Sequence, residues 1–282
     1  MMKTSRQLKD KIRNLAASKS ANAQLLMRTF MTERFLERVS RSEYKEKLIL
    51  KGGTLVTAMV GVEARSTMDV DVTVQGIHLS EDTVASLITK IASIPVEDGV
   101  EFFVKSVSSI MDDVKYPGYR VSMDALFDGT ITAMKLDLST DDVITPGAIE
   151  FPYRLMFEKR EIPVLSYNLE TVLAEKIETI LSRGVLNTRM RDYYDIYILN
   201  ELYHDVVTLS DLGQALNATA GKRGTARQLI DAKAILQECV MSKALSDLWS
   251  SYASTYSYAS SITWQHVTGV VIHLVDEVMT QK

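Results

Sequence analysis

The stretch ARSTMDVDVTV, residues 64–74, alternates polar and apolar side chains along its second half. A period of two predicts a β-strand with one buried face. Asp69 and Asp71 then share one face, while Val70 and Val72 share the other. Two carboxylates in that geometry repel each other unless a cation lies between them, and Mg²⁺ fits because it prefers oxygen ligands. Taken alone, the pair also fits a phosphatase nucleophile with its general acid, or two solvated charges.

A further carboxylate follows on a later strand-like run. Two-metal phosphoryl chemistry requires a ligand from a neighbouring strand. TITAMKLDLS (130–139) supplies Asp137, which shares a face with Lys135. Asp124, one strand earlier, is a competing candidate. Asp128-Gly129 separates the two runs and predicts a hairpin turn between them.

Two glycines and a threonine precede the aspartate pair. LILKGG (48–53) predicts a short strand that ends at Gly52 and Gly53, and a helical pattern begins at Thr54. Glycines at a helix start let the backbone approach an anion, and the free N–H groups can bind phosphate. Gly-Gly-Thr is also typical of a tight turn. Together with the aspartates it predicts a site for a triphosphate and divalent metal ions.

Composition restricts the class of protein. The 282 residues are long enough for two domains, and 46% of them are hydrophobic. The single cysteine, Cys239, excludes an intrachain disulfide and favours a reducing cytoplasmic compartment. Residues 1–20 are basic but lack an apolar segment, so we expect neither a secretory signal nor a membrane association. The net charge of −4 argues against indiscriminate nucleic-acid binding, although a local basic track can bind it at one place.

The hydrophobic pattern divides the chain into a part that mixes helical and strand periods and a later part with helical periods alone. Residues 1–165 combine helices within 4–39 with the strands described above, which predicts an α+β domain. From Asn168, a predicted helix N-cap, the pattern is helical to the end of the sequence. We therefore predict an all-helical C-terminal domain over 166–282.

Several motifs in the same order resemble the AbiEii/AbiGii family of nucleotidyltransferase toxins, within the DNA polymerase β-like nucleotidyltransferase superfamily. The resemblance runs from about Phe30 to Leu199. It rests on KGGT (51–54), the R-x-T-x-D-x-D run of Arg65, Thr67, Asp69 and Asp71, then KLDL, LAEKIETILSRG and TRMRDYYDIYIL. It implies a nucleotidyltransferase-like mixed β-sheet with flanking helices.

The resemblance also assigns roles to residues. It implies that Gly52, Gly53 and Thr54 bind the nucleotide phosphates, and that Asp69, Asp71 and Asp137 bind metal at a two-metal Mg²⁺ site. It implies that Lys176 lies near the nucleotide and that Asp192 has a further catalytic role, with Asp195 in the same motif. Without the family, these last residues also fit ordinary pairing, since Arg191 and Asp195 are four apart on a helix.

The implied activity is transfer of NMP from an NTP to an acceptor hydroxyl, with release of pyrophosphate. The family implies a toxin of a toxin–antitoxin or abortive-infection system, with a cognate antitoxin and RNA as acceptor, the tRNA 3′ end being one candidate. Arg183, Arg189 and Arg191 form a basic track that favours a polyanionic acceptor. Small molecules or proteins are alternative acceptors.

Two other classes of function remain open from the sequence. DVDVT (69–73) matches the DxDxT signature of haloacid-dehalogenase-like phosphatases, although the residues before it are polar where that motif follows an apolar strand. A nucleotidyltransferase fold that binds a partner without chemistry is the second. Retention of three candidate carboxylates argues against that loss of activity.

Overall fold

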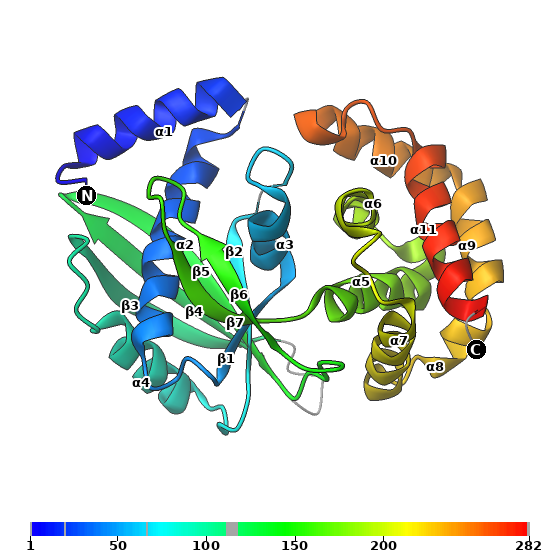
Figure 1. The fold of residues 1–282 in the computed structure, drawn as a ribbon, viewed down its shortest axis with the longest axis horizontal. Coiled ribbons are helices and arrows are strands. Elements are labelled where there is room, and N and C mark those ends of the chain that lie inside the picture. The colour runs from blue at the N-terminus through cyan, green and yellow to red at the C-terminus, as the bar shows by residue number, and fades with distance from the viewer. Residues whose placement is uncertain (1, 20, 66, 111–117, 281–282) are drawn as a thin grey trace. The chain divides into compact units, whose positions relative to one another are not determined.

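The computed structural model of the chain describes residues 2–19, 21–65, 67–110 and 118–280. It divides into two compact units (Figure 1). The first comprises Met1–Asp141 and Ile149–Ser166, and the second comprises Asp142–Ala148 and Tyr167–Lys282. The first unit contains a mixed sheet with helices, and the second is helical, so the predicted α+β class is confirmed.

The first unit contains four helices and seven strands within the described residues. The helices are α1 (Ser5–Lys19), α2 (Ala23–Arg41), α3 (Gly52–Val60) and α4 (Glu81–Ala92). The strands are β1 (Leu48–Lys51), β2 (Asp69–Val74), β3 (Val100–Ile110), β4 (Gly118–Phe127), β5 (Thr130–Thr140), β6 (Ile149–Arg154) and β7 (Glu161–Ser166).

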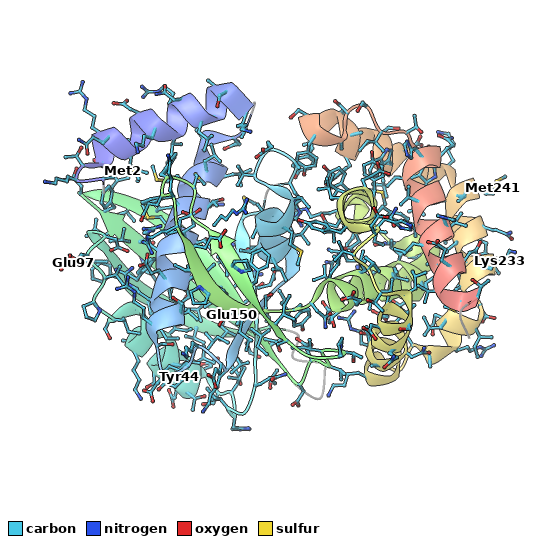
Figure 2. The ribbon with its side chains drawn as sticks, viewed as in Figure 1. Met2, Tyr44, Glu97, Glu150, Lys233 and Met241 are labelled. Atoms are coloured by element: carbon cyan, nitrogen blue, oxygen red, sulfur yellow. The ribbon has the colours of Figure 1, made fainter. Side chains whose placement is uncertain are left out.

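All seven strands form one sheet in the order β3-β4-β5-β2-β1-β7-β6. β2 pairs in parallel with β5, and β1 pairs in parallel with β7, while the other neighbours are antiparallel. The edge strand β6 carries Glu150, which is exposed to solvent (Figure 2). The order places β2 between β1 and β5, in the middle of the sheet.

Alternation along the strands separates a buried face of the sheet from a polar one. Val70 and Val72 on β2 are buried, as are Leu136 and Leu138 on β5. Helix α2 contacts β5 and β7, α4 contacts β3 and β4, and the two helices contact each other, so they cover one face (Figure 1). Side chains of the intervening residues, the aspartates among them, point to the opposite face.

Helix α2 is tied to the sheet by charged side chains that are themselves buried. Asn22 caps its N-terminus by accepting from the backbone N–H groups of Gln24 and Leu25. Arg38 forms a bidentate pair with Asp98 at 2.7 and 3.0 Å. Both side chains are 3% exposed, so removal of one partner would leave a buried charge.

The second unit is built from helices and two short 3₁₀ turns. These elements are α5 (Leu169–Arg183), η1 (Gly184–Leu186), α6 (Met190–Tyr203), α7 (Leu209–Arg223), α8 (Ala226–Ile230), α9 (Ala232–Met241), α10 (Lys243–Thr255), η2 (Ser257–Ala259) and α11 (Trp264–Thr280). Asn168 caps α5 as predicted, because its side chain accepts from Thr171 N–H at 2.7 Å. Within the described part of the chain, no helix has the length and apolarity that a bilayer span requires.

Candidate active site

The turn between β1 and α3 is shaped around the carboxylate of Asp71. Gly52 adopts φ +61°, a conformation that favours glycine, and a Cβ built there would lie 2.2 Å from Asp71 Oδ2. The next backbone N–H, that of Gly53, donates to the same oxygen at 3.2 Å. The glycines therefore make room for this carboxylate and hold it at the start of helix α3.

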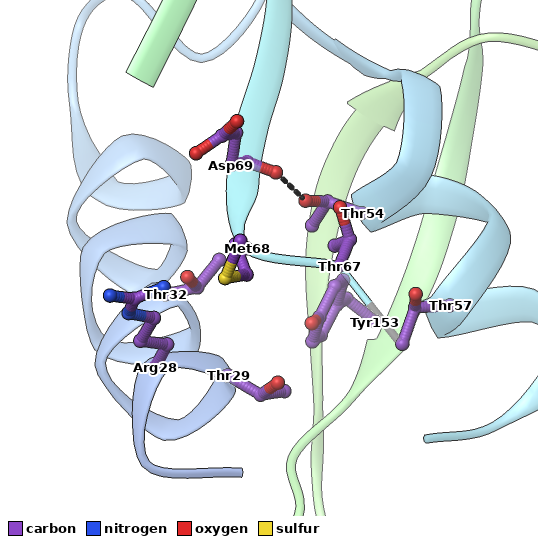
Figure 3. Close-up of a pocket in the computed structure, with 9 residues that line it drawn as sticks. All are labelled: Arg28, Thr29, Thr32, Thr54, Thr57, Thr67, Met68, Asp69 and Tyr153. Atoms are coloured by element: carbon purple, nitrogen blue, oxygen red, sulfur yellow. Dashed lines mark hydrogen bonds between the residues drawn. The ribbon is translucent and has the colours of Figure 1, made fainter. Parts of the chain in front are cut away.

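The second glycine faces the R-x-T part of the motif. A Cβ on Gly53 would lie 2.7 Å from Thr67 Oγ1 and 2.8 Å from Arg65 Nη1. Arg65 is 2% exposed, so its guanidinium is packed against the turn. Thr54 is also buried, and its hydroxyl donates to the backbone oxygen of Asp69 at 2.9 Å (Figure 3). Thr54 thus links α3 to the strand that carries the aspartate pair.

Strand register places four charged residues in a row across the sheet. Asp71 is the direct partner of Lys51 on β1 and of Asp137 on β5. Asp137 is in turn the direct partner of Arg120 on β4. The row therefore reads Lys51, Asp71, Asp137, Arg120, with two carboxylates in the middle and a cation at each end. Asp69, two residues before Asp71, shares their face of the sheet.

The carboxyl group of Asp71 lies close to two other negative charges, those of Asp137 and Asp69. Burial raises the pKa of its carboxyl, and the charges of Asp137 and Asp69 raise it further. Lys51 and the N–H of Gly53 act in the opposite direction without reversing the shift. A carboxylate in this position gains from an added cation, so Asp69 and Asp71 fit a divalent ion by donor chemistry as well as by placement.

Asp137 lies beside Asp71 but is engaged elsewhere. Arg120 Nε donates to Asp137 Oδ1 at 2.7 Å, and Nη2 donates to Oδ2 at 2.6 Å. Among the residues that the structure describes, no three acidic, histidine or cysteine side chains are gathered into a group able to hold a metal ion. Two carboxylates are thus available together, and the third is held by an arginine.

The competing carboxylate, Asp124, is not in the row. Its direct partner on β5 is Ala133, four pairs away from the Arg120–Asp137 pair. Its side chain contacts Lys105 on the edge strand β3 at 3.1 Å. Of the two candidates for a third carboxylate, the register brings Asp137 beside Asp71.

A small pocket opens beside Asp69. Residues of α2, α3, β6 and the segment before β2 line it (Figure 3): Arg28, Thr29, Thr32, Thr54, Thr57, Thr67, Met68, Asp69 and Tyr153. Three of its hydroxyl groups donate to backbone oxygens, those of Thr29, Thr54 and Thr57. These hydroxyls consequently present oxygen lone pairs to an occupant, and Arg28 is the cation in the lining.

Lys176 and Asp192 meet in the second unit. Lys176 Nζ lies 2.6 Å from Asp195 Oδ2 and 3.3 Å from Asp192 Oδ1. All three side chains are nearly inaccessible to solvent, the most exposed being that of Lys176 at 10%. Arg189 reaches Asp192 from outside at 2.9 Å. The two motifs LAEK and RDYYD therefore form one buried ion cluster between α5 and α6.

The other residues of the basic track have different surroundings. Arg183 is exposed, whereas Arg191 is half-buried and donates to the hydroxyl of Tyr256 at 3.5 Å. Asp195 pairs with Lys176 from α5, a partner that helical spacing within α6 cannot indicate. Tyr193 and Tyr194 are buried, so they are packing residues of this unit.

Sequence reasoning missed two members of the charged row. Lys51 is the first letter of KGGT, yet nothing local marks it as the neighbour of Asp71. Arg120 carries no motif, and its alternation with Ser122 and Asp124 only indicates a polar strand face. Arg65 was noted in the motif without a role, and its burial against Gly53 supplies one.

Comparisons with known proteins place the chain in a family. Residues 34–269 match the model of the nucleotidyl transferase AbiEii toxin family of type IV toxin–antitoxin systems. No curated protein matches the sequence. The fold resembles that of MenT4, a nucleotidyltransferase toxin from Mycobacterium tuberculosis, with a TM-score of 0.53 and 12% identity over 97% of this chain and 99% of that one.

A second solved structure gives the same result for the fold. JHP933 from Helicobacter pylori superposes with a TM-score of 0.53 and 13% identity, over 92% of each chain. At such identities the likeness concerns the fold alone. The family match spans most of the chain and includes the glycine turn, the aspartate strand and the buried ion cluster. The chain therefore belongs to the AbiEii family and is a nucleotidyltransferase toxin.

Proposed function

We propose that this transferase moves NMP from an NTP to an acceptor hydroxyl in the presence of Mg²⁺ and releases pyrophosphate. The observation that carries the proposal is the pairing of Asp69 and Asp71 on one strand face with a glycine turn whose N–H groups start a helix. Carboxylates beside a helix N-terminus place metal ligands next to N–H groups that can donate hydrogen bonds to phosphate oxygens, and nucleotidyl transfer requires both.

Each part of the site then has a task. Asp69 and Asp71 would hold Mg²⁺, which when bound neutralises charge on the reacting phosphate and orients its oxygens. The backbone of Gly52 and Gly53 allows phosphate oxygens to approach α3, while Thr54 fixes that turn to β2. Asp137 is the third carboxylate of the expected set, held by Arg120 in the structure.

Lys176 and Asp192 are proposed to act on the nucleotide side of the reaction. This assignment comes from the family resemblance, and the buried ion cluster is compatible with it because Asp195 can keep Lys176 charged and oriented. The same cluster also contributes to the packing of α5 against α6. A test of Lys176 must therefore measure folding and nucleotide binding separately.

RNA is the proposed acceptor, the tRNA 3′ end being one candidate, with a cognate antitoxin as partner. Exposed cations on α1, namely Arg6, Lys9 and Arg13, and Arg183 on α5 support a polyanionic acceptor. Arg183→Glu should weaken RNA labelling more than nucleotide binding, whereas Lys243→Glu, in an exposed pair with Asp247, should change neither. If Arg183→Glu weakened RNA labelling and nucleotide binding equally, the acceptor assignment would be contradicted.

The activity is tested by incubating the full chain with each labelled NTP, Mg²⁺ and total RNA. Label should enter RNA with release of pyrophosphate, and Asp71→Asn should abolish it. Asp124→Asn is the matched control, since it removes a carboxylate from β4, which β5 separates from the strand of Asp71. Release of inorganic phosphate without labelling would favour the phosphatase alternative, and unchanged labelling by Asp71→Asn would overturn the proposed site.

A further inference from the structure

The guanidinium of Arg120 is fitted to the carboxylate of Asp137. The two residues are direct cross-strand partners on β4 and β5. Both carboxylate oxygens accept a hydrogen bond, at 2.7 and 2.6 Å, in the two-pronged geometry that makes arginine–carboxylate pairs strong. The side chains are 36% and 20% exposed, so the pair lies at the surface of the polar sheet face and is partly shielded from water.

The same arginine acts on the other two carboxylates through its charge. Arg120 donates its hydrogen bonds to Asp137, its charge also interacts with Asp69 and Asp71, and an arginine stays protonated at every pH at which proteins fold. Arg120 thus remains a cation beside the carboxylates that would hold Mg²⁺. A fixed positive charge at this place opposes the binding of another cation.

Asp137 is consequently a poor metal ligand while Arg120 holds it. Each oxygen of a carboxylate has two lone-pair sites, and a bidentate arginine occupies one on each oxygen. Asp137 is the direct strand partner of Asp71, yet both of its carboxylate oxygens accept hydrogen bonds from Arg120.

We propose that Arg120 withholds Asp137 from the metal site of the nucleotide-free protein, so that Asp69 and Asp71 alone hold one divalent cation. The inference rests on the proposed function only in assigning Asp69 and Asp71 to the metal. Arg120 is a positioning residue in this scheme, because it acts through Asp137. It sets how many ions the free protein holds and how tightly.

Direct binding of Mn²⁺ to the full chain, without nucleotide or acceptor, tests the inference. We expect one Mn²⁺ per wild-type chain, counted by the spectroscopic signal of free Mn²⁺ and by calorimetry. Arg120→Gln removes a charge and frees a carboxylate, so it should bind Mn²⁺ about tenfold more tightly or bind a second ion. Weaker binding by Arg120→Gln would overturn the inference, as would failure of the wild type to bind Mn²⁺.

A double variant separates charge from ligation. Arg120→Gln with Asp137→Asn removes one positive and one negative charge, so the net charge of the row is unchanged. If Asp137 is withheld in the wild type, this variant should bind Mn²⁺ with the wild-type stoichiometry and within about twofold of its affinity. A tenfold loss would mean that Asp137 is a ligand despite Arg120, and the inference would fail.

A matched control is provided by another cross-strand arginine. Arg154 on β6 is the direct partner of Glu161 on β7 and lies 2.9 Å from its carboxylate. Arg154→Gln makes the same change of charge outside the row and should leave Mn²⁺ binding unaltered. Circular dichroism and thermal melting of every variant show whether the fold is retained.

The outcomes distinguish this inference from the proposed function. If the wild type labels RNA but the double variant loses Mn²⁺, only the role of Arg120 is wrong. If the Mn²⁺ results are as expected but no NTP and acceptor give transfer, only the proposed reaction is wrong.

Discussion

Asp71 and Asp137 are directly opposed residues on the parallel strands β2 and β5. Parallel pairing brings together residues from separate parts of the chain and points both carboxylates to the same face. Their repulsion is offset on one side by Lys51 and on the other by Arg120. Two adjacent carboxylates therefore lie in the middle of the sheet, where an added cation would relieve their repulsion.

Gly52 is predicted to be essential for the position of Asp71. Gly52→Ala places a Cβ 2.2 Å from Asp71 Oδ2 in addition to the backbone strain of φ +61°. We expect loss of NMP transfer and destabilisation by more than about 2 kcal/mol, since strain and displacement of a buried carboxylate add. Chemical denaturation and labelled-NTP assays measure the two effects.

Gly76 supplies the control for this prediction. It has φ +69°, and a Cβ there would meet nothing within 4 Å. Gly76→Ala should cost about 1 kcal/mol from strain alone and retain activity. Equal effects of the two substitutions on activity would show that contact with Asp71 is not what Gly52 provides.

The local parts of this site were predictable from sequence, and the non-local parts were not. Alternation in DVDVTV fixed the strand and the shared face of Asp69 and Asp71, and the period-two pattern did the same for Asp137. The choice between Asp137 and Asp124 depends on β5 lying next to β2, which is a pairing between distant segments. The partnership of Arg120 with Asp137 depends on register and carries no sequence signal of its own.

The buried ion cluster shows the same limit within the helices. Helical spacing correctly places Asp192 and Asp195 on one face of α6, and it offers Arg191 as a partner. The structure pairs Asp195 with Lys176 from α5, because packing of the two helices buries that face. Local spacing does not reveal which helix lies opposite.

Lys176 is predicted to be structural as well as functional. Lys176→Met would leave the carboxylates of Asp192 and Asp195, at 3% and 0% exposure, without their shared cation. Breaking a buried pair in this way costs about 3–5 kcal/mol, so the free energy of unfolding should fall by that order. Denaturant titration measures the loss.

Neutralising Asp192 and Asp195 as well should restore the stability that Lys176→Met loses, while NMP transfer stays absent. The triple variant Lys176→Met, Asp192→Asn and Asp195→Asn removes the three buried charges of the cluster and leaves the exposed Arg189, so much of the stability should return. Lys243→Met, in an exposed pair with Asp247, should change stability by no more than about 0.5 kcal/mol. A triple variant that regains stability and also transfers NMP would contradict the functional role of Lys176.

Glu33 on α2 is predicted to make the protein less stable as the pH rises. Burial raises its pKa to about 8, and the charge of Arg34 and the hydrogen bond from Met156 N–H act in the opposite direction without reversing the shift. The unfolded chain releases this proton near pH 4.5 and the folded chain near pH 8, so stability is lost across that range. Glu33→Gln should flatten the decline, which urea denaturation at pH 5, 6.5 and 8 would detect; a difference from wild type that stays constant with pH would contradict it.

Glu37, one turn further along α2, should show the opposite dependence. Its side chain is also buried, which favours the neutral acid, but hydrogen bonds and charge from Arg160, with Arg34 and Arg41, outweigh burial and lower its pKa. The folded protein then releases the proton at lower pH than the unfolded chain, so Glu37 stabilises above about pH 4.5 and that contribution disappears in acid. Glu37→Gln should cost about 3 kcal/mol at pH 7, because it leaves arginines without their carboxylate, and its difference from wild type should shrink as the pH falls below about 4.5. Urea denaturation of wild type and Glu37→Gln at pH 3, 4, 5 and 7 provides the check: a difference that does not shrink as the pH falls below about 4.5 would mean that packing of α2, rather than its ion pairs, controls this carboxyl group.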